Sequence, residues 1–131
     1  MPYPLWPAII TLLTLVLLIG VAMNVGRYRA RYGVAAPATT GHPLFERAYR
    51  VQMNTLENAV LFLPALWLAA QWGKPLLVAA CGLVWIGARI FYALSYLKDP
   101  AKRGPGFGLA FLAVSVLMVI AAKGIVLALL A

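Results

Sequence analysis

Long apolar stretches are the feature of this sequence that most limits how it can fold. Hydrophobic residues make up 64% of the 131 residues, and the mean hydropathy is +0.91, whereas soluble domains are about half apolar. A helix that crosses a bilayer needs about 20 apolar residues. The length allows four such helices and no separate soluble domain. The sequence therefore predicts an all-α, integral membrane four-helix bundle, with residues 1–131 forming a single transmembrane domain.

Four spans are expected, at about residues 5–26, 45–72, 76–97 and 107–130. Glycine, proline and threonine in residues 33–43 indicate an irregular loop, Gly73-Lys74-Pro75 a tight turn, and residues 99–106 a second loop. Pro43 and Glu46 suit the first turn of a helix. The N-terminus lacks the positive segment of a signal peptide, so the first helix is expected to be retained.

Basic residues lie mainly on one side of this predicted topology. The connections after the first and third spans carry Arg27, Arg29, Arg31, Arg47, Arg50, Lys98, Lys102 and Arg103. The other side has Lys74 and Lys123. The positive-inside rule then places the basic loops in the cytoplasm and both termini opposite. The C-terminus has no charged retrieval signal, which favours a bacterial inner membrane, or the endoplasmic reticulum if the source is eukaryotic.

Several kinds of site are not expected. The net charge of +8 arises between hydrophobic runs and not on an amphipathic face, so nucleic-acid binding is disfavoured. Cys81 is the single cysteine and has no partner for a disulfide or a cysteine-based metal site, and no metal is expected. His42 fits a solvated loop residue beside Pro43.

Ionisable residues inside spans need a physical explanation, because each costs several kcal/mol unless it is paired or faces a cavity. Residues at three- and four-residue steps share a helix face. These sets are Glu46, Arg50, Asn54, Glu57 and Asn58 on the second helix, and Arg89, Tyr92 and Tyr96 on the third. Arginines bind carboxylates, a glutamate binds an ammonium, and amides and phenols bind peptide groups, so a small zwitterionic peptide fits. The alternative is that the charges neutralise one another for packing or oligomer registry, and spacing alone leaves both open.

Two stretches of the second helix resemble the signature of the MAPEG family, the membrane-associated proteins in eicosanoid and glutathione metabolism. They are residues 45–58, FERAYRVQMNTLEN, and residues 61–67, LFLPALW. The resemblance continues in TTG at 39–41, CGLVW at 81–85 and RIFY at 89–92, and covers about residues 27–106.

The resemblance implies a homotrimer that binds glutathione between neighbouring subunits near the cytoplasmic face. The positions that match glutathione-binding residues of the family are Arg29, Arg50, Gln52, Asn54, Glu57, Tyr92 and Tyr96. Arg103 matches the arginine that stabilises the glutathione thiolate, and is the implied catalytic residue. Asn58 and Ala30 replace a tyrosine and an arginine of the leukotriene-forming members, which argues against that reaction. Arg50 is absent from the non-enzymatic branch, so its presence favours a catalytic member.

The expected function is a membrane-bound glutathione transferase in detoxification, with glutathione as co-substrate and hydrophobic electrophiles or lipid hydroperoxides from the bilayer as second substrates. A glutathione-dependent peroxidase activity is a further expectation. One alternative is a non-enzymatic, lipid-binding member of the family. Another is a small four-span exporter, but its glutamate should titrate deep in the bilayer, whereas Glu57 lies among arginines in the cytoplasmic half.

Overall fold

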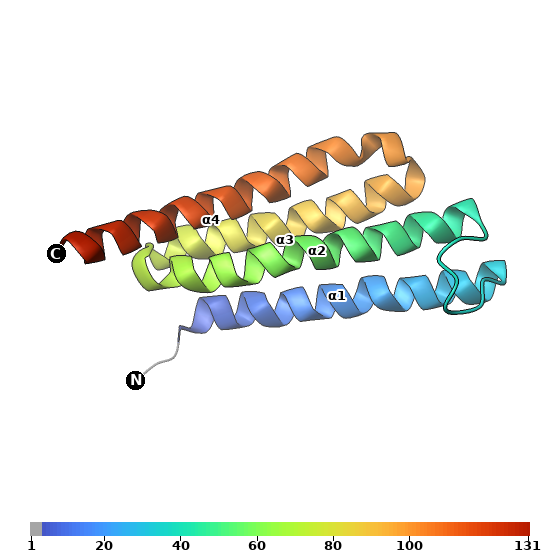
Figure 1. Cartoon of the computed structure of the whole chain (residues 1–131), viewed down its shortest axis with the longest axis horizontal. Helices are drawn as coiled ribbons and strands as arrows, with labels where there is room; N and C mark the ends of the chain where they lie inside the picture. The colour runs from blue at the N-terminus through green and yellow to red at the C-terminus, as the bar shows by residue number, and fades with distance from the viewer. Residues whose placement is uncertain (1–3) are drawn as a thin grey trace.

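The computed structural model describes residues 4–131, which form four long α-helices and one 3-10 turn (Figure 1). The elements are α1 (Leu5–Tyr32), α2 (Pro43–Trp72), α3 (Pro75–Lys98), η1 (Pro100–Arg103) and α4 (Gly104–Leu130). These described residues contain no strand. The predicted all-α four-helix bundle is therefore confirmed.

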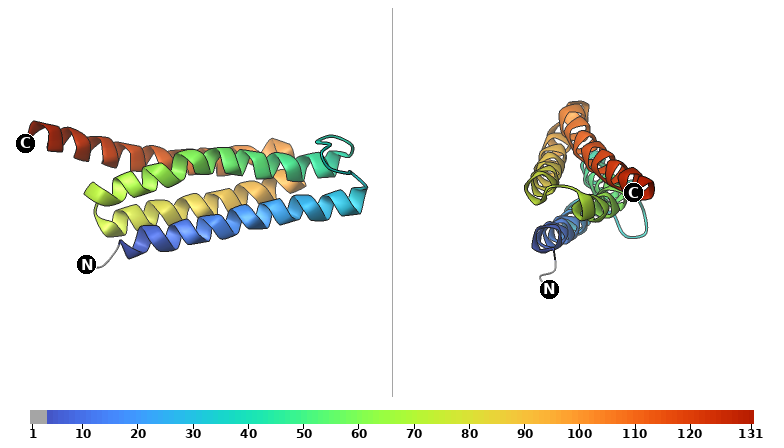
Figure 2. Two further views of the ribbon diagram at one scale, coloured as in Figure 1. Left: turned by 60° about the horizontal axis from the view of Figure 1, so that its bottom comes forward. Right: turned by 90° about the vertical axis from the view of Figure 1, so that its left-hand side faces the viewer.

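The helices run alongside one another, so that their connections gather at two ends of the bundle (Figures 1 and 2). The loop between α1 and α2 and the η1 turn lie at one end, which we call the basic end because the helix ends and the η1 turn there carry most of the lysines and arginines. The α2–α3 turn lies at the opposite end, the turn end, together with the start of α1 and the end of α4 (Figure 1). Most of the basic residues therefore lie at one end of the bundle, as the predicted order of the helices requires.

Two helices extend further than their predicted spans. The first span was expected to finish near Gly26, but α1 continues to Tyr32, and Arg27 and Arg31 are exposed on it. Gly33 ends the helix because its φ of 67° is left-handed, a conformation that glycine adopts without a Cβ clash. The second predicted loop, residues 99–106, is instead η1 followed by the start of α4 at Gly104.

Three of the helical segments are long and apolar enough to cross a membrane: α1, α3, and η1 with α4. The segment α2 is not among them because polar side chains occupy its first half. It nevertheless runs beside the other helices along their length (Figures 1 and 2). Its polar groups must therefore be covered by protein wherever the bundle is surrounded by lipid.

The apolar core occupies the middle of the bundle. The rings of Phe62 on α2 and Trp85 on α3 are stacked with centroids 3.9 Å apart, and both are fully buried. The indole Nε1 of Trp85 donates to Asn58 Oδ1 at 2.6 Å, so Asn58 serves packing between α2 and α3. Large apolar side chains such as Leu12 and Leu112 are exposed on the outer faces, as expected for helices in contact with lipid.

Candidate functional site

A cavity of ≈300 Å³ lies near the basic end, between α2, α3, η1 and the start of α4. It is lined by Arg50, Asn54, Tyr92, Arg103, Gly104 and Phe107. Two guanidinium groups, an amide and a phenol therefore face one small space that no carboxylate lines. Groups of this kind favour an anionic or peptide-like ligand. Four of the eight predicted site residues are brought together here.

Arg103 reaches the cavity from the last residue of η1. The carboxylate of Asp99 accepts a hydrogen bond from the backbone N–H of Ala101 at 3.0 Å and so caps this short turn. Arg47 of α2 donates from Nη1 to the carbonyl oxygens of Leu97 and Lys98, at 3.2 and 3.1 Å. These bonds fix the end of α3 against α2, and thereby position the turn that carries Arg103.

Tyr92 forms the wall of the cavity on α3, and its side chain is buried. A Cβ at Gly106 would lie 2.8 Å from the backbone nitrogen of Tyr92, so the glycine allows α4 to approach α3 at this point. The rings of Tyr92 and Tyr96 have centroids 5.7 Å apart. Tyr96 thus supports the Tyr92 wall although it does not line the cavity itself.

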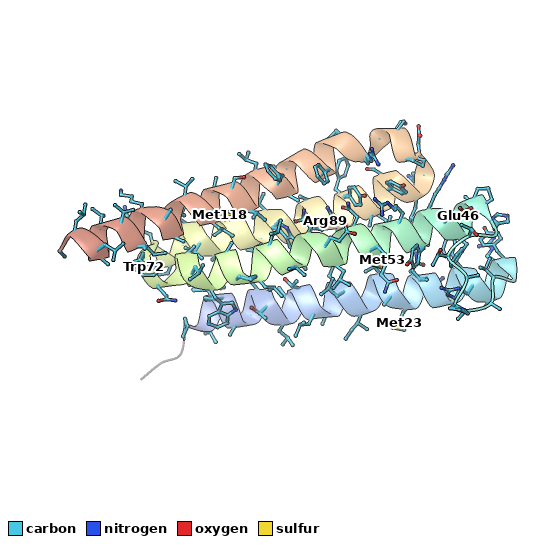
Figure 3. All side chains as sticks on the ribbon, in the orientation of Figure 1. Met23, Glu46, Met53, Trp72, Arg89 and Met118 are labelled. Carbon is cyan, nitrogen blue, oxygen red and sulfur yellow. The ribbon has the colours of Figure 1, made fainter. Side chains whose placement is uncertain are left out.

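Arg89 is the largest polar side chain that the structure buries completely, with 0% of its surface exposed (Figure 3). Its Nη2 donates to Asn54 Oδ1 and to Thr55 Oγ1, both at 2.9 Å, and its guanidinium carbon lies 4.0 Å from the centroid of the Tyr92 ring. Its Nε and Nη1 have no hydrogen-bond partner within residues 4–131. A buried cation therefore lies directly behind two walls of the cavity.

The contact between Arg89 and Asn54 determines what Asn54 can offer a ligand. An amide has one accepting oxygen and one donating NH₂ group. Because the oxygen accepts from Arg89, the NH₂ group of Asn54 remains available as a donor. Arg50, Arg103 and Asn54 can then all donate hydrogen bonds, and the cavity is chemically suited to carboxylate or thiolate groups.

Four predicted site residues do not line this cavity: Tyr96, described above, and Arg29, Gln52 and Glu57. Arg29 is half-buried, and its Nη1 donates to the carbonyl oxygens of Val34 and Ala38 at 3.4 and 2.7 Å, so it holds the α1–α2 loop. Gln52 is two residues from Arg50, which places it about 200° away around α2 at about 100° per residue. Glu57 shares the Arg50 side of the helix but is exposed on the outside of the subunit.

Mutual neutralisation of these charges is not seen in the subunit. Among the side-chain hydrogen bonds of residues 4–131, none joins Arg50 to Glu46 or to Glu57. Arg50 and Glu57 are both exposed. The charges of the cavity are therefore open to an external ligand or to a neighbouring protein surface.

Some contributors to this region were not selected from the sequence. Gly104 and Phe107 line the cavity, but both lie where a loop and the start of an apolar span were expected. His42 was expected to be a solvated loop residue, but it is half-buried, its Nδ1 accepts from the backbone N–H of Leu44 at 3.1 Å, and its ring stacks on Tyr32 at 4.0 Å. A histidine just before Pro43, at the predicted start of a helix, was the available signal for this cap.

Metal-ligating side chains do not gather in the described part of the chain, where no group of three His, Cys, Asp or Glu residues could hold an ion. Cys81 is half-buried and free.

Comparison with known proteins places this bundle in a family. The model of the MAPEG family matches residues 5–123. An uncharacterized protein of Synechocystis sp. is 50% identical over 88% of this chain and 84% of its own. Microsomal glutathione S-transferase 2 of Homo sapiens is 36% identical over 79% of this chain and 71% of its own. Leukotriene C4 synthase of Cavia porcellus is 38% identical over 73% of this chain and 64% of its own. The chain belongs to the MAPEG family, as the motifs of its second and third helices predicted.

Proposed function

We propose that this protein is a membrane-bound glutathione transferase that conjugates the glutathione thiolate to hydrophobic electrophiles dissolved in the bilayer. The observation that carries the proposal is the convergence of Arg50, Asn54, Tyr92 and Arg103 on one cavity that no carboxylate lines. The relatives named as glutathione S-transferases and leukotriene C4 synthases support glutathione as the co-substrate. The Arg89 cation behind the cavity adds positive potential at the same place.

Each group has a chemical role in this proposal. Arg50 and Asn54 bind carboxylate or amide oxygens of the tripeptide. Tyr92 and Tyr96 pack against its backbone. Glu57 binds its ammonium group. Arg103 lies directly before the first residue of α4 and stabilises the sulfur as a thiolate anion. The thiolate is the nucleophile, so the residue that lowers the thiol pKa activates the substrate. The apolar outer faces of the helices bring the electrophile to the sulfur from the membrane.

The remaining residues, Arg29 and Gln52, take part only if two subunits share each site. Gln52 and Arg50 point to different sides of α2, so a single copy cannot present both to one small ligand. A neighbouring copy that packs its Gln52 side against the Arg50 side would complete the set. We therefore propose a homotrimer with glutathione bound between subunits, as the family resemblance implies.

One assay separates the functions that this cavity can perform. The detergent-purified protein is incubated with glutathione and a chromogenic aryl halide, and separately with glutathione and a lipid hydroperoxide. Conjugate formation is the expected result, and hydroperoxide reduction would add peroxidase activity. Glutathione binding without either reaction would identify a non-enzymatic binder and contradict the proposal. Absence of glutathione binding would contradict both the proposed reaction and the assignment of the cavity as a glutathione site.

The topology follows from the distribution of charge. We propose that the basic end faces the cytoplasm, because its helix ends and the η1 turn carry most of the lysines and arginines. The site then draws on cytoplasmic glutathione. A bacterial inner membrane is the proposed location. The exporter alternative is weakened because Glu57 lies on the same side of α2 as Arg50, one of the two arginines that line the cavity.

A further inference from the structure

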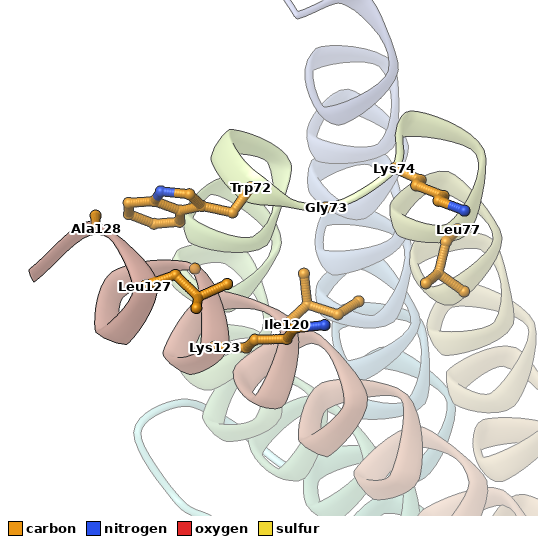
Figure 4. A pocket seen from close by; sticks show the side chains of 9 residues that line it. Trp72, Gly73, Lys74, Leu77, Ile120, Lys123, Leu127 and Ala128 are labelled. Carbon is orange, nitrogen blue, oxygen red and sulfur yellow. The ribbon is translucent and has the colours of Figure 1, made fainter. Parts of the chain in front are cut away.

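A second cavity lies at the turn end, away from the candidate glutathione site (Figure 4). Its volume is ≈680 Å³, and it lies between the α2–α3 turn and the C-terminal part of α4. Trp72, Leu77, Ile120 and Leu127 give it apolar walls, and Lys74 and Lys123 add two cations. The cavity therefore combines an apolar surface with the positive charge of two lysines.

These two lysines have no acidic residue near them. The sequence has three acidic residues, Glu46, Glu57 and Asp99, and all lie in the other half of the bundle or at the basic end. The nearest along α2 is Glu57, about 22 Å of helix away from Trp72 at about 1.5 Å per residue. No side chain of the subunit can neutralise Lys74 and Lys123 from that distance. Both lysines are exposed, so they are free to bind an anion from outside the protein.

The packing of α4 sets the two lysines at the same depth. A Cβ at Gly124 would overlap the Trp72 side chain, so α4 crosses the end of α2 in close contact at this level. Beyond the crossing, α4 continues past the α2–α3 turn (Figures 1 and 2). Lys123, next to Gly124, is therefore level with Lys74 in the turn. Trp72 lies beside them, and tryptophan and lysine are both residues that are enriched at the headgroup level of a bilayer.

The apolar wall continues from this level toward the bilayer centre. Leu77 lies three residues into α3 from Lys74, and Ile120 lies one helical turn before Lys123 on α4. Both side chains line the cavity. A ligand held by its phosphate at the lysines would thus lay a hydrocarbon chain along Leu77 and Ile120.

We propose that this cavity binds an anionic phospholipid of the surrounding leaflet, with the phosphate between Lys74 and Lys123 and an acyl chain over Leu77 and Ile120. The cations supply the preference for a negative headgroup, and the apolar walls supply the preference for a lipid over a free anion. This inference does not depend on the proposed transferase function, because it uses none of the residues of the basic end.

Native mass spectrometry of the full chain in mild detergent tests the proposal. The protein is titrated with dioleoyl phosphatidylglycerol and with dioleoyl phosphatidylcholine, which share their acyl chains and differ in net charge. The first phosphatidylglycerol should bind more tightly than phosphatidylcholine. Lys74→Ala/Lys123→Ala should weaken that first binding roughly 30-fold, from about fivefold for each lysine near an anionic lipid. Both lysines are exposed, so the variant should fold.

A matched pair and a second readout complete the test. Lys98→Ala/Lys102→Ala removes the same charge at the basic end and should leave the first binding unchanged. Phosphatidylglycerol with brominated chains should quench parent fluorescence more than that of Trp72→Phe. Inorganic phosphate at equal concentration should not displace the lipid. Equal binding of the two lipids, a larger loss in the basic-end pair, equal quenching in Trp72→Phe, or displacement by phosphate would each overturn the proposal.

Discussion

Arg103 is the residue on which the chemistry of the proposed reaction depends most. A free thiol has a pKa of about 8.5 and is only a few per cent ionised at neutral pH. Lowering that pKa by about two units makes most of the bound glutathione anionic, which corresponds to about 2.7 kcal/mol of differential stabilisation. In the proposed site, Arg103 supplies the charge, while other residues hold the peptide.

Arg103→Ala should therefore bind glutathione within several-fold of the parent and lose most turnover at neutral pH. Turnover should partly return as the pH rises toward the pKa of the free thiol. Thiolate absorbance in the ultraviolet, followed during a glutathione titration, reports the anion directly. Lys102→Ala, the neighbouring charge, is the matched control and should behave like the parent. A parental thiolate signal in Arg103→Ala would assign the activation to another cation.

Arg89 acts through its neighbours, because it is buried behind Asn54 and Tyr92 and does not line the cavity. Two nitrogens of Arg89 have no hydrogen-bond partner in residues 4–131, so an apolar side chain of similar volume removes a buried and partly unsatisfied charge and offsets the lost hydrogen bonds. Arg89→Met should therefore fold with nearly the parental melting temperature. It should lower glutathione affinity by up to about tenfold, since one hydrogen bond contributes about 0.5–1.5 kcal/mol and Asn54 loses its fixed orientation.

Calorimetry on a double-mutant cycle with Asn54→Ala checks this coupling. If Arg89 works by orienting Asn54, the double variant should bind glutathione about as well as Asn54→Ala alone. Strictly additive losses would show that the two residues act independently.

Four of the residues that line the cavity were predictable, because helical spacing and the family motif both depend on local sequence, whereas Gly104 and Phe107 belong to no such pattern. Arg50 and Asn54 lie one turn apart, and the structure places both at the cavity. The roles of Arg29 and His42 were not predictable in this way. Both make their bonds within or beside the α1–α2 loop, whose path is set by tertiary packing and leaves no periodic pattern in the sequence.

At the scale of elements, the cavity depends on how closely α4 approaches α3. Gly106 lies against the backbone of Tyr92, where an added Cβ would be 2.8 Å from the nitrogen and 2.9 Å from Cα. A backbone cannot yield as a flexible side chain can. Gly106→Ala should push α4 outward, cost about 1–3 kcal/mol of stability as overpacking does, and reduce glutathione affinity because Phe107 and Arg103 move with the helix.

Gly108→Ala is the matched control on the same helix. Nothing lies within 4 Å of a Cβ built at Gly108, and alanine favours the helix by up to about 1 kcal/mol over glycine. Thermal unfolding in detergent and a glutathione titration should show losses for the first variant alone. Equal behaviour of the two variants would mean that the α3–α4 contact adjusts without affecting the cavity.

The limits of the helices show what a hydrophobicity pattern reports. The predicted spans at Leu5 and Leu130 agree with the start of α1 and the end of α4, where apolar residues begin and end. The pattern missed the extension of α1 to Tyr32 because a helix can continue beyond the bilayer with charged side chains. It also missed η1, since a single 3-10 turn capped by Asp99 has no periodicity to detect.

For the whole molecule, the polar outer surface of α2 is the feature that favours association of subunits. Glu57 lies 14 residues after Pro43, about 21 Å along a helix of 30 residues, and is exposed in the isolated subunit. A carboxylate that faces lipid inside a bilayer is costly. Covering it requires protein, and a second copy of this chain is the cover that the family resemblance implies. In the proposed trimer, the Arg50 side of α2 in one subunit meets the Gln52 side of the next, and a head-to-tail contact of this kind closes into a ring.

Native mass measurement in mild detergent should therefore give three times the subunit mass of 14.1 kDa. A sharper test asks whether each site spans two subunits. Gln52→Leu and Arg103→Ala impair opposite sides of the proposed interface. In trimers assembled from both variants, some sites take Arg103 from a Gln52→Leu subunit and Gln52 from an Arg103→Ala subunit, so both residues are intact there. Turnover at low glutathione should then exceed the average of the two variants measured alone. A site confined to one subunit cannot be restored by mixing, so turnover equal to that average, or a stable monomer that binds glutathione as the parent does, would contradict the shared site.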